Sequence, residues 1–247
     1  FFLYMAHYAV HTPIQAKAAL TERYEKKPKT NQDNAKYAAM IKSVDEAAGK
    51  ILDALDELGL AEDTLVIFTG DNGGLEGPTD NAPLRSGKGF PYEGGIRVPV
   101  LIRWPAEIPE AQISYEPVSS QDFFPTILEA VGIDLPENRP IDGVSLLSHL
   151  RSGGTEKLPR ESLLWHFPHY RQGHTVPPYS IVRQGNWKLL KWWEGPTYEL
   201  YNLQEDIGEE NNLASEMPGK VEELDAELDR LLQETDSKLP RPNPDYN

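Results

Sequence analysis

Cysteine is absent from this chain of 247 residues, and long apolar runs are absent as well. Without cysteine, neither a disulfide framework nor a thiolate metal site is possible. No apolar stretch approaches the ~20 residues that a helix needs to span a bilayer. Basic residues are scarce, since 24 Lys and Arg stand against 39 Asp and Glu and the net charge is -15. This charge disfavours nucleic acid and anionic membranes as partners. An anionic substrate must therefore be attracted locally, by a metal ion and a lysine.

The sequence also opens without an initiator methionine and without the basic flank of a signal peptide. Its first six residues, FFLYMA, instead have the apolar character of a core strand. We therefore expect this sequence to be the carboxyl-terminal part of a longer protein.

The hydrophobic pattern predicts two regions, residues 1–157 and 158–247. In the first, a strand at 1–6, an amphipathic helix at 32–58 and a strand at 64–69 follow one another, an order that implies a parallel strand pair. In the second, short strands separated by turns predict a small antiparallel sheet. The other expected elements are a strand at 98–104, helices at 122–132, 144–150 and 218–234, strands at 162–165, 179–183, 187–192 and 198–203, and a loose tail at 240–247. The fold class is therefore α/β, with a small carboxyl-terminal sheet and helix.

The most informative stretch is residues 64–99, in which an apolar strand stops at the sequence GDNGG. Ligands of open α/β sheets collect at the carboxyl ends of strands. Asp71 and Asn72 offer the hard oxygens that calcium and magnesium prefer, and Lys88 follows between two glycines. Taken alone, Asp71 and Asn72 are typical of an Asn-Gly turn, and Lys88 is typical of a solvated loop. Together they predict a site for an oxyanion ester.

Seven segments carry a resemblance to a known family. In chain order they are AHYAVHTPIQA, TGDNGG, LRSGKGFPYEGGIRVP, SSQDFFPTILEAVGI, IDGVSLL, IVRQGNWKLL and ELYNLQEDIGEENNLA. This order resembles the arylsulfatase-like, formylglycine-dependent sulfatases of the alkaline-phosphatase-like superfamily. The resemblance implies a mixed sheet flanked by helices, hydrolysis of sulfated carbohydrates or aryl sulfates with calcium or magnesium, and a periplasmic or secreted protein.

The resemblance also implies roles for individual residues. Asp71 and Asn72 would bind the metal, and Lys88 would contact the sulfate and stabilise the departing oxygen. His11, in the HTP sequence, is the candidate general acid, because an imidazole titrates near neutrality. Arg85 is a further candidate for the same positive pocket. His166 and His169, which stand among aromatic residues, are equally compatible with a substrate pocket and with a surface loop.

The nucleophile of this family is a formylglycine made from the first residue of a C/S-x-P-x-R motif, which this sequence lacks. The paired aspartates that complete the family's metal site are absent too. We therefore expect the nucleophile in the missing amino-terminal part, and no turnover of sulfate esters by this chain alone. Two other functions stay open: a phosphonate monoester or phosphodiester hydrolase of the same superfamily, and a non-catalytic protein that binds sulfated glycans.

Overall fold

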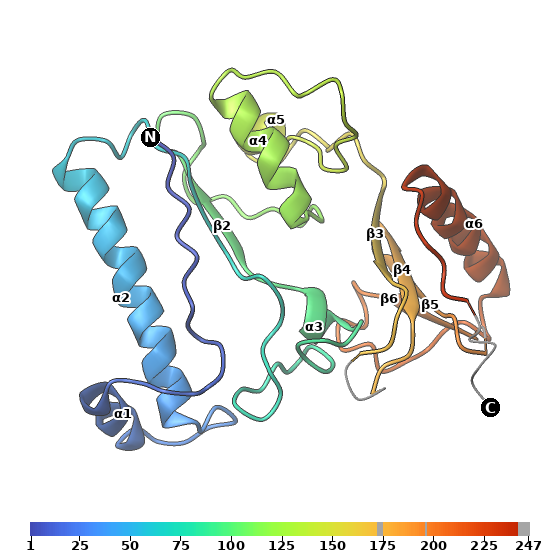
Figure 1. The fold of residues 1–247 in the computed structure, drawn as a ribbon, viewed down its shortest axis with the longest axis horizontal. Helices are drawn as coiled ribbons and strands as arrows, with labels where there is room; N and C mark the ends of the chain where they lie inside the picture. The colour runs from blue at the N-terminus through green and yellow to red at the C-terminus, as the bar shows by residue number, and fades with distance from the viewer. Residues whose placement is uncertain (172–174, 196, 242–247) are drawn as a thin grey trace.

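The computed structural model describes residues 1–171, 175–195 and 197–241. Figure 1 shows helices around a strand pair in the first region, and a separate sheet backed by one helix in the second. The elements of the first region are α1 (Ala18–Glu25), α2 (Ala35–Glu57), β1 (Val66–Thr69), α3 (Glu93–Ile96), β2 (Val100–Arg103), η1 (Ser120–Asp122), α4 (Phe123–Ala130) and α5 (Leu147–Arg151). Those of the second are β3 (Ser162–Phe167), β4 (Tyr179–Gln184), β5 (Trp187–Trp192), β6 (Thr197–Asn202) and α6 (Pro218–Glu234). Most of the expected tail at 240–247 lies outside the described residues.

The long helix predicted at 32–58 is confirmed as α2. Asn34 begins it as the N-cap, since its side chain accepts a hydrogen bond from the Tyr37 amide at 3.0 Å. Gly59, with φ of +67°, follows the helix in the left-handed conformation that glycine adopts without strain. In the part of the chain that the structure describes, no helix is both long and apolar enough to cross a membrane.

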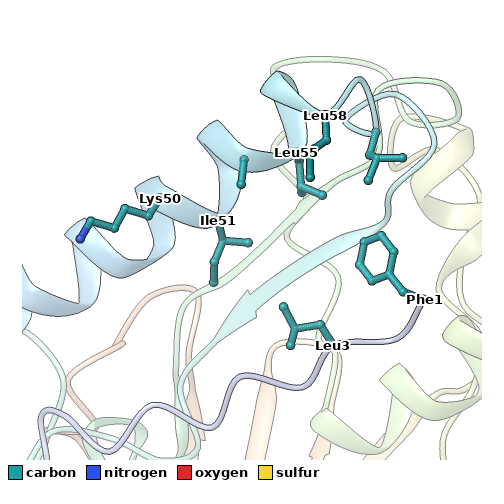
Figure 2. Close-up of a pocket in the computed structure, with 8 residues that line it drawn as sticks. Phe1, Leu3, Lys50, Ile51, Leu55 and Leu58 are labelled. Atoms are coloured by element: carbon teal, nitrogen blue, oxygen red, sulfur yellow. The ribbon is translucent and has the colours of Figure 1, made fainter.

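The expected strand at residues 1–6 is wrong, and so is the parallel pair. Residues 1–6 are irregular and exposed, and β1 instead pairs antiparallel with β2, Val66 opposite Arg103. The physical reason is that a strand needs a neighbouring strand for its backbone groups. Phe1 and Leu3 lie beside α2, where they help to line an apolar hollow of ≈ 410 Å³ (Figure 2). The hollow contains none of the predicted site residues.

The antiparallel sheet of the second region is confirmed, with strand order β3-β4-β5-β6. On one face, Val182, Leu189 and Leu200 pack against the leucines of α6. On the other face, Ile181, Leu190 and Tyr201 pack with Tyr92 from the first region. The sheet is therefore a layer between α6 and the loop that leads into α3, which brings the second region against the segment that contains Lys88.

A buried ion pair also joins the two regions. Asp122, at the start of the helix predicted at 122–132, is fully buried and pairs with Arg160 through both carboxylate oxygens, at 2.5 and 2.9 Å. The same carboxylate accepts hydrogen bonds from the backbone amides of Ser119 and Val144. Four donors satisfy this buried charge, as burial requires.

Candidate active site

The predicted metal-ligand pair lies at the end of β1. Asp71 is exposed and Asn72 half-buried, and the Asn72 side-chain nitrogen donates to Asp71 Oδ2 at 2.6 Å. Within the described ranges, neither Asp71 Oδ1 nor the Asn72 side-chain carbonyl has a hydrogen-bond donor. Two hard oxygens are therefore free, and their chemistry fits calcium or magnesium. The residues that the structure describes include no cluster of three or more His, Asp or Glu side chains that could hold a metal ion.

Glycines bring this loop into direct contact with the lysine loop. The Lys88 amide donates to the Gly74 carbonyl, and the Gly73 amide to the Gly95 carbonyl, both at 2.9 Å. A Cβ on Gly73 would lie 1.7 Å from the Gly94 carbonyl oxygen, so only glycine permits this approach. Asp71, Asn72 and Lys88 therefore belong to two loops that are joined backbone to backbone.

The ammonium of Lys88 is available for a ligand. Its side chain is half-buried, and among the described residues it has no hydrogen-bond acceptor and no ion-pair partner. By contrast, the buried amines of Lys188 and Lys191 each contact two carboxylates. An unpaired cation on a loop that is bonded to the loop of two free oxygens can bind an anion whose charge a metal ion shares.

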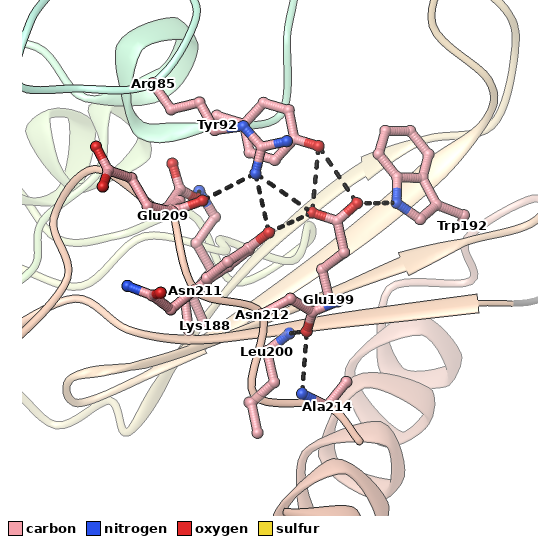
Figure 3. Close-up of polar contacts among 12 residues, drawn as sticks. Arg85, Tyr92, Lys188, Trp192, Glu199, Leu200, Glu209, Asn211, Asn212 and Ala214 are labelled. Atoms are coloured by element: carbon pink, nitrogen blue, oxygen red, sulfur yellow. Dashed lines mark hydrogen bonds and ion pairs between the residues drawn. The ribbon is translucent and has the colours of Figure 1, made fainter. Parts of the chain in front are cut away.

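Arg85, predicted to bind substrate, is a structural residue in the geometry of Figure 3. Its guanidinium lies 3.6 Å from the centre of the Tyr92 ring. It donates to the Tyr201 hydroxyl and to the Glu209 carbonyl, both at 2.9 Å, and Glu199 is 3.7 Å away. The guanidinium is therefore occupied by partners from β6 and the following turn, which contact it across the interface between the two regions.

Replacement of Arg85 by lysine tests this structural role. Lysine keeps the charge but loses the planar stacking and the forked donors, so we expect the free energy of unfolding to fall by about 1–2 kcal/mol. Urea unfolding measures the change, with Arg139→Lys at an exposed position as the control. If Arg85→Lys raised KM without loss of stability, Arg85 would be a substrate-binding residue after all.

Arg85, Tyr92, Trp192 and Tyr201 form a cluster around one carboxylate, that of Glu199. It accepts hydrogen bonds from the hydroxyls of Tyr92 and Tyr201 and from the Trp192 indole, as the dashed lines in Figure 3 show. Burial raises the pKa of both tyrosine hydroxyls, so they remain protonated donors over the physiological range. Three donors thus converge on the Glu199 carboxylate.

His11 lies on a loop, as predicted, and is exposed. Its Nδ1 is 2.9 Å from the Thr12 carbonyl, and its ring contacts Tyr8. Within the described ranges, no hydrogen bond, ion pair or ring contact joins His11 to the Asp71 or Lys88 loops. Its role as general acid stays a prediction.

The structure places the two later histidines on different sides of the C-terminal sheet. His166 lies on the face of the sheet that α6 covers, with Nδ1 2.7 Å from Ser180 Oγ and Nε2 3.1 Å from the Lys238 carbonyl. The alternation of side chains along β3 gives this orientation, because Phe167 takes the opposite face. His169 is exposed and lies against Phe167, with ring centres 4.0 Å apart. This geometry favours the non-catalytic alternative for His166, whereas both alternatives stay open for His169, which lies two residues before the Arg171 that contacts Phe90.

Sequence reasoning missed a buried charge cluster formed by Glu93, Lys188 and Glu209. All three side chains are buried, and Lys188 Nζ lies 3.1 Å from Glu93 Oε1 and 2.7 Å from Glu209 Oε1. The acidic sequence around Glu209, EDIGEE, is typical of a solvated turn, but the Glu209 side chain is buried. The signal available was Lys188 itself, a lysine at an inward position of an apolar strand, which requires an acidic partner.

Comparison with solved structures defines the class of fold. The chain superimposes on Ps i-CgsB, solved in complex with k-i-k-neocarrahexaose, with a TM-score of 0.76 and 28% identity over 94% of this chain and 49% of that one. A second structure, solved with its substrate D-glucosamine-2-N,6-O-disulfate, gives a TM-score of 0.67 and 29% identity over 90% of this chain and 43% of that one. The fold is that of the alkaline-phosphatase-like proteins, mixed α/β.

Sequence comparison assigns the family. The model of the sulfatase family matches residues 1–133, and that of the N-sulphoglucosamine sulphohydrolase carboxyl-terminal region matches residues 86–238. A sulfatase of Formosa agariphila is 37% identical over 89% of this chain and 43% of its own length. Human arylsulfatase A is 32% identical over 94% of this chain and 48% of its own length. The chain therefore belongs to the sulfatase family, and it spans less than half the length of either relative.

Proposed function

We propose that the protein carrying this chain is a sulfatase, which hydrolyses sulfate esters, and that this chain supplies half of its active site. The observation that carries the proposal is the backbone contact between the loop of Asp71 and Asn72 and the loop of Lys88, at 2.9 Å, in a member of the sulfatase family. We further propose that residues 1–157 belong to the catalytic domain and that residues 158–247 form a small domain packed against it.

Each residue of the site has one task in this proposal. Asp71 and Asn72 hold a divalent cation, calcium or magnesium, through their free oxygens. When bound, the cation neutralises charge on the sulfuryl oxygens. The Lys88 ammonium contacts a sulfuryl oxygen and stabilises the charge that develops as the ester bond breaks. His11 donates a proton to the departing oxygen. The nucleophile, a formylglycine by family resemblance, comes from outside this chain.

For the substrate we propose a sulfated carbohydrate. The relatives support this class, since N-acetylgalactosamine-6-sulfatase of Sus scrofa is 34% identical over 84% of this chain. Two of the solved structures named above contain carbohydrate ligands. Aryl sulfates are the second class, supported by the match to human arylsulfatase A.

The test compares the full-length protein with this chain alone. We expect the full-length protein to hydrolyse 4-methylumbelliferyl sulfate and a sulfated oligosaccharide, and the chain alone to hydrolyse neither, because it lacks the nucleophile motif. Release of 4-methylumbelliferone and of inorganic sulfate measures the two reactions.

A matched aryl phosphodiester serves as the comparison substrate. Faster turnover of the phosphodiester by the full-length protein would contradict the sulfatase assignment. Enzyme-like turnover by the chain alone would contradict the proposed division of the active site.

A further inference from the structure

The short helix α3 is the support on which both loops of the site rest. The Gly95 carbonyl accepts from the Gly73 amide, and the Gly94 amide donates to the Arg85 carbonyl, each at 2.9 Å. A Cβ on Gly94 would lie 2.2 Å from the Ser86 carbonyl oxygen, so the helix and the lysine loop are also in close contact. Any movement of α3 is therefore transmitted to both loops.

The second region fixes the first residue of this helix. The Glu93 amide donates to Glu209 Oε2 at 2.6 Å, and the Glu93 carboxylate contacts Lys188 Nζ at 3.1 Å. Two arginines lie farther from Glu93 Oε2, Arg97 at 3.5 Å and Arg183 at 3.9 Å. A four-residue helix has little stability of its own, so these contacts determine where it lies.

Lys188 holds the cluster together electrostatically. It lies between two buried carboxylates, and in the part of the chain that the structure describes the Lys188 ammonium, at 2.7 Å, is the one group that contacts Glu209 Oε1. Burial raises the pKa of the Glu209 carboxyl, and the neighbouring Lys188 opposes that rise. Without the Lys188 ammonium, less positive charge would balance the buried carboxylates of Glu93 and Glu209, and the two carboxylates would repel each other.

We propose that Lys188 and Glu209 are positioning residues for the active site: through Glu93 they hold α3, and through α3 the loops of Asp71 and Lys88. Through these two residues, the C-terminal region helps to position the catalytic loops. The catalytic consequence rests on the proposed sulfatase function, whereas the structural consequence does not.

The strand β5 offers a matched pair of variants. Lys188→Met removes the amine that faces α3, and Lys191→Met removes a second buried amine that contacts Asp225 and Asp229 of α6. In the full-length protein, at a temperature where both variants are folded, we expect Lys188→Met to lower kcat at least ~10-fold, because small displacements of catalytic groups are costly. Lys191→Met should lower the melting temperature but leave kcat unchanged.

A charge-balance variant separates positioning from simple destabilisation. Adding Glu209→Gln to Lys188→Met removes one unpaired carboxylate and keeps an acceptor for the Glu93 amide, so part of kcat should return. A role in stability alone predicts parallel losses for Lys188→Met and Lys191→Met and no recovery in the double variant. That result would overturn the inference.

Hydrogen exchange on the same full-length proteins gives a readout independent of turnover. Lys188→Met should speed exchange of the Gly73, Lys88 and Gly94 amides at least ~10-fold relative to wild type, while Lys191→Met should affect α6. Unchanged exchange in the Lys188 variant would refute the positioning role. Faster exchange in the Lys188 variant, together with a wild-type full-length protein that hydrolyses no sulfate ester, would refute the sulfatase function alone.

Discussion

Replacement of Lys88 by methionine should lower kcat/KM for a sulfate ester by about 10²–10³-fold, the usual cost of removing one group that stabilises developing charge. Methionine is close to lysine in length but carries no charge. Within the described residues the Lys88 ammonium has no partner, so its removal breaks no internal contact. The loss should therefore fall on catalysis, with a melting temperature close to that of wild type.

Steady-state kinetics on the full-length protein measure this effect, and circular dichroism follows the melting temperature. Lys36→Met, at an exposed position of α2, is the control for loss of one positive charge on an acidic protein. If Lys36→Met reduced activity as much as Lys88→Met, general attraction of an anionic substrate would explain the loss, and the assignment of Lys88 would be wrong.

Elements with strong local patterns could be predicted from the sequence. The helix α2 has helical spacing, a capping Asn34 and a terminal Gly59, and all of these signals lie within or next to the helix. The strands β3 to β6 have short apolar runs between turns. Such elements need no knowledge of distant residues.

Contacts between residues that are far apart in the chain could not be predicted. The pairing of β1 with β2 depends on which strand edges meet. Arg85 bonds to Tyr201, 116 positions away, and to the Glu209 carbonyl, 124 positions away. His166 reaches the Lys238 carbonyl, 72 positions away. A residue type and its neighbours cannot indicate that a charge is already satisfied by a distant segment.

For the candidate site, the sequence identified residues but not their support. Asp71, Asn72 and Lys88 followed from a strand end and a glycine-flanked cation, and the structure joins their loops. The fixed position of those loops depends on a charge cluster around Glu93, which has no motif of its own. Spacing therefore indicates candidate groups for the chemistry, while packing decides how accurately such groups are held.

Replacement of Gly73 by alanine should reduce kcat/KM about 10²-fold and lower the free energy of unfolding by about 1–3 kcal/mol. The new Cβ would lie 1.7 Å from the Gly94 carbonyl oxygen and 2.9 Å from Gly95 Cα. Both are backbone atoms, which cannot rotate out of the way, so the loop must move from α3 by roughly an ångström or more. That movement would break the hydrogen bond from the Gly73 amide to the Gly95 carbonyl and displace Asp71 from Lys88.

Gly49→Ala is the matched control, because Gly49 lies within α2 and a Cβ there meets nothing within 4 Å. Alanine favours a helix over glycine by about 1 kcal/mol, so this variant should be slightly more stable than wild type and equally active. Full activity in Gly73→Ala would mean that the loops can separate without consequence. The close contact at α3 would then have no role in catalysis. Loss of activity in Gly73→Ala, with full activity in Gly49→Ala, would show that the contact between the Asp71 loop and α3 is required for turnover.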